Sequence, residues 1–102
     1  MSIPLLHRDI YEITADATPI QGAKVRGRVR KFALDTQQNL LVENDENSEK
    51  IVRFAVLTGS DITIVSDYIM SIIPDAHITS MMTNVANPTL SKLKINDVTR
   101  YV

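Results

Sequence analysis

An apolar stripe between Gly59 and Pro74 constrains the fold of this chain more than any other feature. Its four aliphatic residues recur at the spacing of one helical face, and they are Ile62, Val65, Ile69 and Ile72. Gly59-Ser60-Asp61 suits a helix N-terminus, and Pro74 ends the helix. Burying each aliphatic side chain is worth about 1.5–3 kcal/mol. The helix must therefore cover an apolar surface, which we predict to be a sheet.

Short segments rich in β-forming residues supply the strands of that sheet. They are residues 8–15, 40–44, 50–57 and 77–83. The polar residues 45–49 are predicted to form a hairpin turn rather than a metal site. Residues 84–91, which include Pro88, are predicted to be a polar connection, and residues 93–102 a final strand. The strands are therefore separated by turns and by helical segments.

The segment 24–37 is ambiguous, because its first residues alternate as those of a strand would. A helix places Phe32 on the same stripe as Val25 and Val29, with Ala33 and Thr36 completing it. A strand would put Phe32 on the face opposite the two valines. Gly27 costs roughly 1 kcal/mol relative to alanine inside a helix, but the helical pattern is the more economical. We therefore predict a helix.

The order of these elements predicts an α+β fold, a ferredoxin-like βαββαβ two-layer sandwich. Each half places one helix over an antiparallel sheet, so both helices lie on one face, and residues 93–102 add a C-terminal strand. The chain has 102 residues, which suits one domain and leaves no room for a second core. We expect residues 1–102 to form a single domain.

Composition excludes several kinds of chemistry. The chain has no cysteine and therefore no thiolate nucleophile or disulfide, while His7 and His77 show no metal-ligand spacing. We expect neither a metal nor a cofactor. A formal net charge of -1 gives no global attraction to nucleic acid or anionic membranes. No segment reaches membrane-spanning length and the first six residues do not form a signal peptide, so we expect a cytoplasmic protein.

The segment from Thr18 to Arg26 is the candidate site of chemistry. It leads from the first strand into the first helix, where backbone N–H groups and the positive end of the helix can hold a phosphate. Gly22 lets the backbone approach a ligand closely, and the guanidinium of Arg26 can meet two phosphate oxygens at once. Charge alone favours a solvated helix face for the basic residues, which are Lys24, Arg26, Arg28, Arg30 and Lys31.

Three motifs together resemble the acylphosphatase family: Ile20-Gln21-Gly22, Arg26 and Leu41-Val42-Glu43-Asn44. In that family a V-Q-G loop leads to an arginine, and a strand ends in an asparagine. The similarity extends across the chain, since the helix start at 59–61, the passage 74–78 and the closing strand at 93–95 follow the family's order. This chain has Thr18 where the family loop opens with glycine, followed by Pro19, and Lys24-Val25 before the arginine.

The resemblance implies metal-free hydrolysis of acyl phosphates to a carboxylate and inorganic phosphate. Arg26 would clamp the phosphoryl group together with loop N–H groups, and Asn44 would orient the attacking water. The implied phosphate-binding residues are Thr18, Ile20, Gln21, Gly22, Ala23, Lys24 and Val25. An activated anhydride needs positioning and charge stabilisation more than a general base. The missing histidine base is therefore no argument against an enzyme.

A second function from a different class stays open. The chain could be a non-catalytic ferredoxin-like module that keeps the anion pocket, or that binds a partner through Lys24, Arg28 and Lys31. RNA recognition favours exposed aromatic side chains, and the chain has only three tyrosines and two phenylalanines, so we do not expect a nucleic acid. We expect a monomer or a weak homo-oligomer, paired through exposed strand edges.

Overall fold

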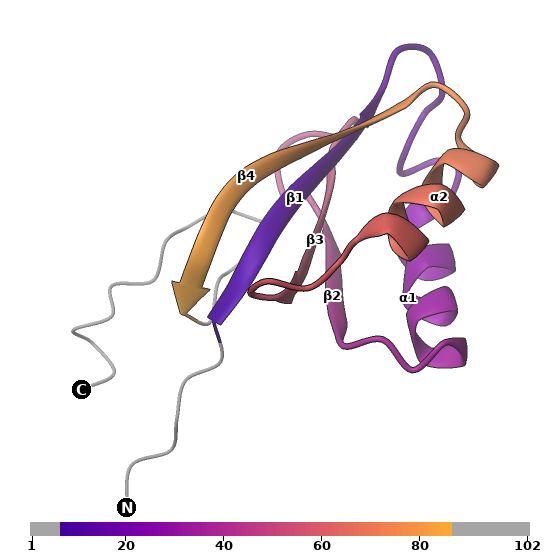
Figure 1. Cartoon of the computed structure of the whole chain (residues 1–102). Coiled ribbons are helices and arrows are strands. Elements are labelled where there is room, and N and C mark those ends of the chain that lie inside the picture. Colours follow the sequence, from indigo (N-terminus) through magenta and orange to yellow (C-terminus); the bar gives the residue numbers. More distant parts are fainter. Residues whose placement is uncertain (1–6, 87–102) are drawn as a thin grey trace, which may run out of the picture.

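The computed structural model describes residues 7–86, and its six elements follow the predicted order (Figure 1). They are β1 (His7–Ala15), α1 (Val25–Asp35), β2 (Leu40–Asn44), β3 (Val52–Leu57), α2 (Thr63–Ile72) and β4 (Ala76–Ala86). The antiparallel sheet has the order β2-β3-β1-β4, and both helices lie on one face of it. The predicted ferredoxin-like sandwich is confirmed. The strand predicted at 93–102 lies outside the described residues.

The main core lies between the helices and the sheet. Its fully buried members include Val25 and Val29 from α1, Ile69 from α2, and Ile13 and Phe54 from the sheet. The helical stripes predicted for both segments thus supply residues to the core between the two layers of the sandwich.

Two stacked aromatic pairs tie this core together. Tyr11 of β1 stacks on Phe54 of β3, with ring centroids 5.2 Å apart. Phe32 of α1 stacks on Tyr68 of α2, with centroids 4.2 Å apart. Stacked rings contribute beyond the area that they bury. The Phe32 position confirms the helical interpretation of the first segment, since that ring faces the second helix.

The centre of the opposite face of the sheet, along β3, is also buried. Ile10, Ala55 and Val85 form a second apolar cluster there. Arg53 lies on the same face at 6% exposure, and its guanidinium pairs with the carboxylates of Glu12, 3.1 Å away, and Asp45. A buried charge is tolerated when it is paired in this way. β3 is therefore buried on both faces, although only one face carries helices.

β4 extends further than the sequence predicted. Asn84 adopts the left-handed conformation, with φ 56, and its N–H donates to Asp9 Oδ1 at 2.9 Å. Register shifts in the β1–β4 ladder mark bulges, after which Arg8 pairs with Val85. The predicted connection at 84–91 is therefore wrong in its first three residues, which continue the strand. Residues 87–91 lie outside the described part of the chain.

Candidate functional site

The loop between β1 and α1 folds as one short helical turn that closes immediately before α1. The Lys24 N–H donates to the Gln21 carbonyl at 3.0 Å, and the Val25 N–H reaches the Ile20 carbonyl at 3.5 Å. These two bonds form the Schellman pattern, which requires a left-handed residue. That residue is Lys24, with φ 60. α1 therefore begins at Val25 and not at Lys24.

Only part of the predicted cradle has backbone donors available for a ligand. Pro19 has no N–H, the Thr18 N–H donates to a carboxylate, and the N–H groups of residues 23–25 donate to loop carbonyls. The remaining three N–H groups have no hydrogen-bond partner among residues 7–86, and they belong to Ile20, Gln21 and Gly22. Donors in a first helical turn lack partners within the helix itself. They can therefore serve an anion.

Asp75, in the connection from α2 to β4, fixes the first half of the loop. Its carboxylate accepts hydrogen bonds from the Thr18 hydroxyl at 2.6 Å and from the N–H groups of Ala17 at 2.8 Å and Thr18 at 3.1 Å. These bonds, led by the Thr18 hydroxyl, hold the pKa of the Asp75 carboxyl well below its ordinary value. Thr18, which we predicted to bind phosphate, thus has both of its donors bound to Asp75.

Gln21 fixes the second half of the loop to the β2–β3 hairpin. Its Nε2 donates to the carbonyls of Ser48 at 2.8 Å and Ile51 at 3.0 Å. The N–H groups of the Gln21 side chain are therefore occupied by the protein, and only its backbone N–H can donate to an anion. Together with Asp75, it holds the loop from two sides.

Arg26 lies in the first turn of α1, above the edge strand β2. Its Nη1 is 3.9 Å from Glu43 Oε2, and the two side chains are 54% and 56% exposed. An exposed pair at this distance is weak, and it leaves most of the five guanidinium donors available. Glu43 nevertheless brings a negative charge close to the candidate anion site.

Asn44 is the last residue of β2, and it shares the face of the strand that carries buried Val42. The Asn44 Oδ1 is buried and accepts no hydrogen bond within the described residues. A buried acceptor without a donor costs free energy, which a bound water or ligand would recover. The next residue, Asp45, has its carbonyl 3.5 Å from Gln21 Nε2, so Asn44 lies beside the loop.

The fold brings the predicted site residues to one end of the sandwich. β1 and β2 are both antiparallel to β3, so their C-terminal ends lie together, next to the start of α1. Sequence reasoning missed Asp75 and Glu43. Both lie in segments that carry the family resemblance, 74–78 and 41–44, but no role was predicted for either. Nothing in the sequence indicates that the Asp75 carboxylate reaches Thr18.

The comparisons with known proteins add no identity. No family model matches the chain, and comparison with curated proteins and with solved structures found no significant match. Within residues 7–86 no helix is long and apolar enough to span a bilayer, and this part of the chain holds no cluster of side chains suited to a metal ion. What is established is the ferredoxin-like fold, which supports many unrelated functions.

Proposed function

We propose that the β1–α1 loop, Arg26 and Asn44 form an anion site that hydrolyses acyl phosphates. The observation that carries this proposal is the meeting of complementary groups at one end of the sandwich. The free N–H groups of residues 20–22 and the Arg26 guanidinium suit phosphoryl oxygens. The buried, unpaired Asn44 Oδ1 suits a water molecule.

In the proposed reaction the loop N–H groups and Arg26 bind the phosphoryl oxygens and stabilise the charge on them in the transition state. A water donates one O–H to Asn44 Oδ1, and its oxygen attacks phosphorus. The bond between phosphorus and the acyl oxygen breaks, its electron pair leaves on the carboxylate, and both protons of the water remain on the product, which leaves as dihydrogen phosphate. A carboxylate is a stable leaving group, so no general acid is required.

The two attachments of the loop support this proposal, because preorganised donors need no reorganisation during the reaction. Asp75 holds residues 17 and 18, and the Gln21 side chain holds the loop to the hairpin. The free N–H groups of residues 20–22 lie between these two anchors. Their direction is therefore set before a ligand arrives.

A second candidate function is anion binding without catalysis. The loop bonds made by residues 23–25 favour it, because they leave fewer N–H groups for the transition state than the family resemblance implies. Glu43, 3.9 Å from the Arg26 guanidinium, opposes a bound phosphate and a transition state alike and does not separate the two candidates.

The test is hydrolysis of benzoyl phosphate by the full chain in the presence of a chelator, measured beside phosphate binding by calorimetry. Arg26→Ala should lose both phosphate affinity and turnover, whereas Asn44→Ala should keep the affinity and lose about a hundredfold in kcat. Arg28→Ala and Asn47→Ala are matched controls and should change neither. Phosphate binding without turnover in the unmodified chain would favour the second candidate, and the absence of both would contradict both.

A further inference from the structure

β2 is an edge strand of the sheet, and among the described residues it pairs with β3 alone. The Asp45 N–H donates to the Ile51 carbonyl at 3.0 Å. In an antiparallel ladder, residues whose N–H and C=O groups bond the neighbouring strand alternate with residues whose groups point away from it. The residues that direct N–H and C=O groups away from β3 are therefore Leu40, Val42 and Asn44. An edge of this kind is a template for an added strand.

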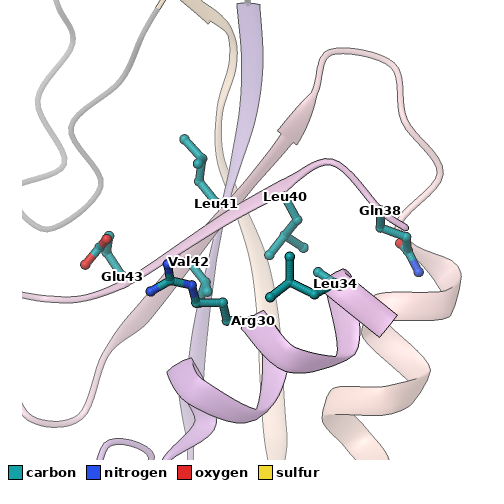
Figure 2. A pocket seen from close by; sticks show the side chains of 8 residues that line it. Arg30, Leu34, Gln38, Leu40, Leu41, Val42 and Glu43 are labelled. Atoms are coloured by element: carbon teal, nitrogen blue, oxygen red, sulfur yellow. The ribbon is translucent and has the colours of Figure 1, made fainter. Parts of the chain in front are cut away.

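A cavity of about 300 Å³ lies between this edge and the second half of α1. Figure 2 shows Leu34 of α1 and Leu40 of β2 pointing toward one another across it, with Arg30 below Val42. Leu34 is 73% exposed, so its side chain is available to a ligand that enters the cavity. The cavity thus offers aliphatic contacts next to unpaired backbone groups.

The helix side of this groove is basic, and Glu43 of β2 is the one acidic residue in the cavity lining. Five exposed basic residues lie on α1 and the residue before it, namely Lys24, Arg26, Arg28, Arg30 and Lys31, whereas Asp35 is the one acidic residue of α1. Arg26 pairs with Glu43 near the end of β2, and Leu34 lines the cavity together with Leu40 at the start of β2. The basic end of α1 therefore lies beside the end of β2, and its apolar end beside the start.

We propose that this groove binds an extended segment of another protein, in which carboxylates accompany alternating aliphatic residues. The segment adds to β2 as a further strand through backbone hydrogen bonds. Its aliphatic side chains enter the cavity between Leu34 and Leu40, and its carboxylates meet Arg30. Main-chain pairing supplies affinity, while the cavity and the charge select the sequence.

Charge distinguishes this partner from the other two occupants that could cover the edge. Residues 87–102 of the chain carry three basic residues and one acidic residue, so they have the same sign as α1. Pairing of β2 with β2 of a second copy would bring two basic helices toward each other. An acidic partner is the occupant that complements the helix side of the groove, with its carboxylates at Arg30 and away from Glu43.

The test uses the full chain and a short synthetic peptide in which every second residue is in turn valine or aspartate, so that both kinds of side chain lie on the strand face next to α1. Its affinity is measured by fluorescence anisotropy, and its site by amide chemical shifts. A matched peptide with lysine in place of every acid should not bind. Methylating the peptide nitrogens one at a time should weaken binding at alternate positions, because only every second residue of an added strand faces β2.

Two pairs of variants separate the groove from general effects. Leu34→Asp should weaken peptide binding about tenfold or more, whereas Ile64→Asp, which changes an exposed aliphatic residue of α2, should not. Arg30→Glu should weaken binding similarly, whereas Arg28→Glu makes the same charge change outside the cavity lining and should have a much smaller effect. All four positions are exposed, so the variants should remain folded, and circular dichroism with urea unfolding checks this independently.

Three results would overturn the proposal. The first is absence of binding by the acidic peptide, and the second is an equal loss in Arg28→Glu and Arg30→Glu, which would show attraction by overall charge. The third is slow hydrogen exchange of the Leu40, Val42 and Asn44 amides in the free protein. Protection that persists on dilution would assign the edge to the chain's own residues, and protection that is lost on dilution would assign it to a second copy.

Discussion

Asp9 and Asp75 make the same set of local contacts at opposite ends of β1, with different consequences. Each carboxylate accepts hydrogen bonds from two backbone N–H groups and one threonine hydroxyl. Asp9 binds Thr58 and Gly59, which follow β3, together with Asn84 in β4. Asp75 binds Ala17 and Thr18 in a single loop. The first carboxylate therefore joins separate parts of the sheet, and the second positions one segment.

The two carboxylates also differ in how deeply they are buried. Asp9 is 8% exposed, and although this burial raises the pKa of its carboxyl, the hydrogen bonds from Asn84, Gly59 and Thr58 bring the pKa below its ordinary value. Asp75 is less buried. One hydrogen-bonding pattern can therefore serve stability where it is buried, and site geometry where a loop must be held near solvent.

The largest expected effect is on stability, in Asp9→Ala. Removing the carboxylate leaves the Gly59 and Asn84 N–H groups without their acceptor, which should cost about 2 kcal/mol of unfolding free energy. Urea unfolding measures this loss. Asp67→Ala, at an exposed position of α2, is the control. Benzoyl phosphate turnover per folded molecule should not change, so a selective loss of turnover would contradict the assigned role.

Asp75→Ala should reverse this balance between stability and activity. The loop start loses its anchor, so the N–H groups of residues 20–22 lose their fixed direction, and kcat/KM should fall about tenfold. The loss of stability should be smaller than in Asp9→Ala, because the donors released at Ala17 and Thr18 can reach water. Hydrolysis and urea unfolding of the same preparation test both parts. Equal stability losses in the two variants would show that the Asp9 and Asp75 carboxylates do not differ in their roles.

Low pH should destabilise the fold through both carboxylates, since the pKa of each carboxyl is lowered in the folded state. The stability that each contributes is fully present above the ordinary value of 3.8 and is lost as the pH falls toward the lowered folded pKa. Unfolding free energy should therefore decline below about pH 4. Asp9→Asn and Asp75→Asn should each flatten this decline, and an unchanged slope in either variant would contradict the role of that carboxylate.

Much of the fold could be predicted because periodicity reports burial directly. β2 is predicted to the residue, Leu40–Asn44, since polar residues flank a short apolar segment. The helical stripe that includes Val29 correctly favoured a helix over a strand for the first ambiguous segment. The predicted element boundaries were wrong next to residues with a left-handed backbone, because Lys24 gives no signal of its conformation. Asn84 gives a weak one, since asparagine tolerates positive φ.

The candidate site was predictable only where motif and topology coincide. Arg26 and Asn44 lie at one end of the sandwich because the strand order puts them there. The partners of Thr18 and Gln21 could not be predicted, since a contact with Asp75 or with hairpin carbonyls depends on the exact path of two loops. Such contacts join residues distant in sequence and leave no periodic pattern.

The smallest expected effect tests whether charge alone can hold the loop. Asp16 and His77 lie next to the Asp75 contacts, with Oδ1 and Nε2 2.9 Å apart, but their side chains are 75% and 57% exposed. Solvent competes for such a pair, so Asp16→Ala should change the unfolding free energy by less than about 0.5 kcal/mol and leave phosphate affinity unchanged. Calorimetry and urea unfolding measure both. A loss of affinity as large as that in Asp75→Ala would show that negative charge near the loop, rather than the acceptance of its backbone donors, determines how the loop is held.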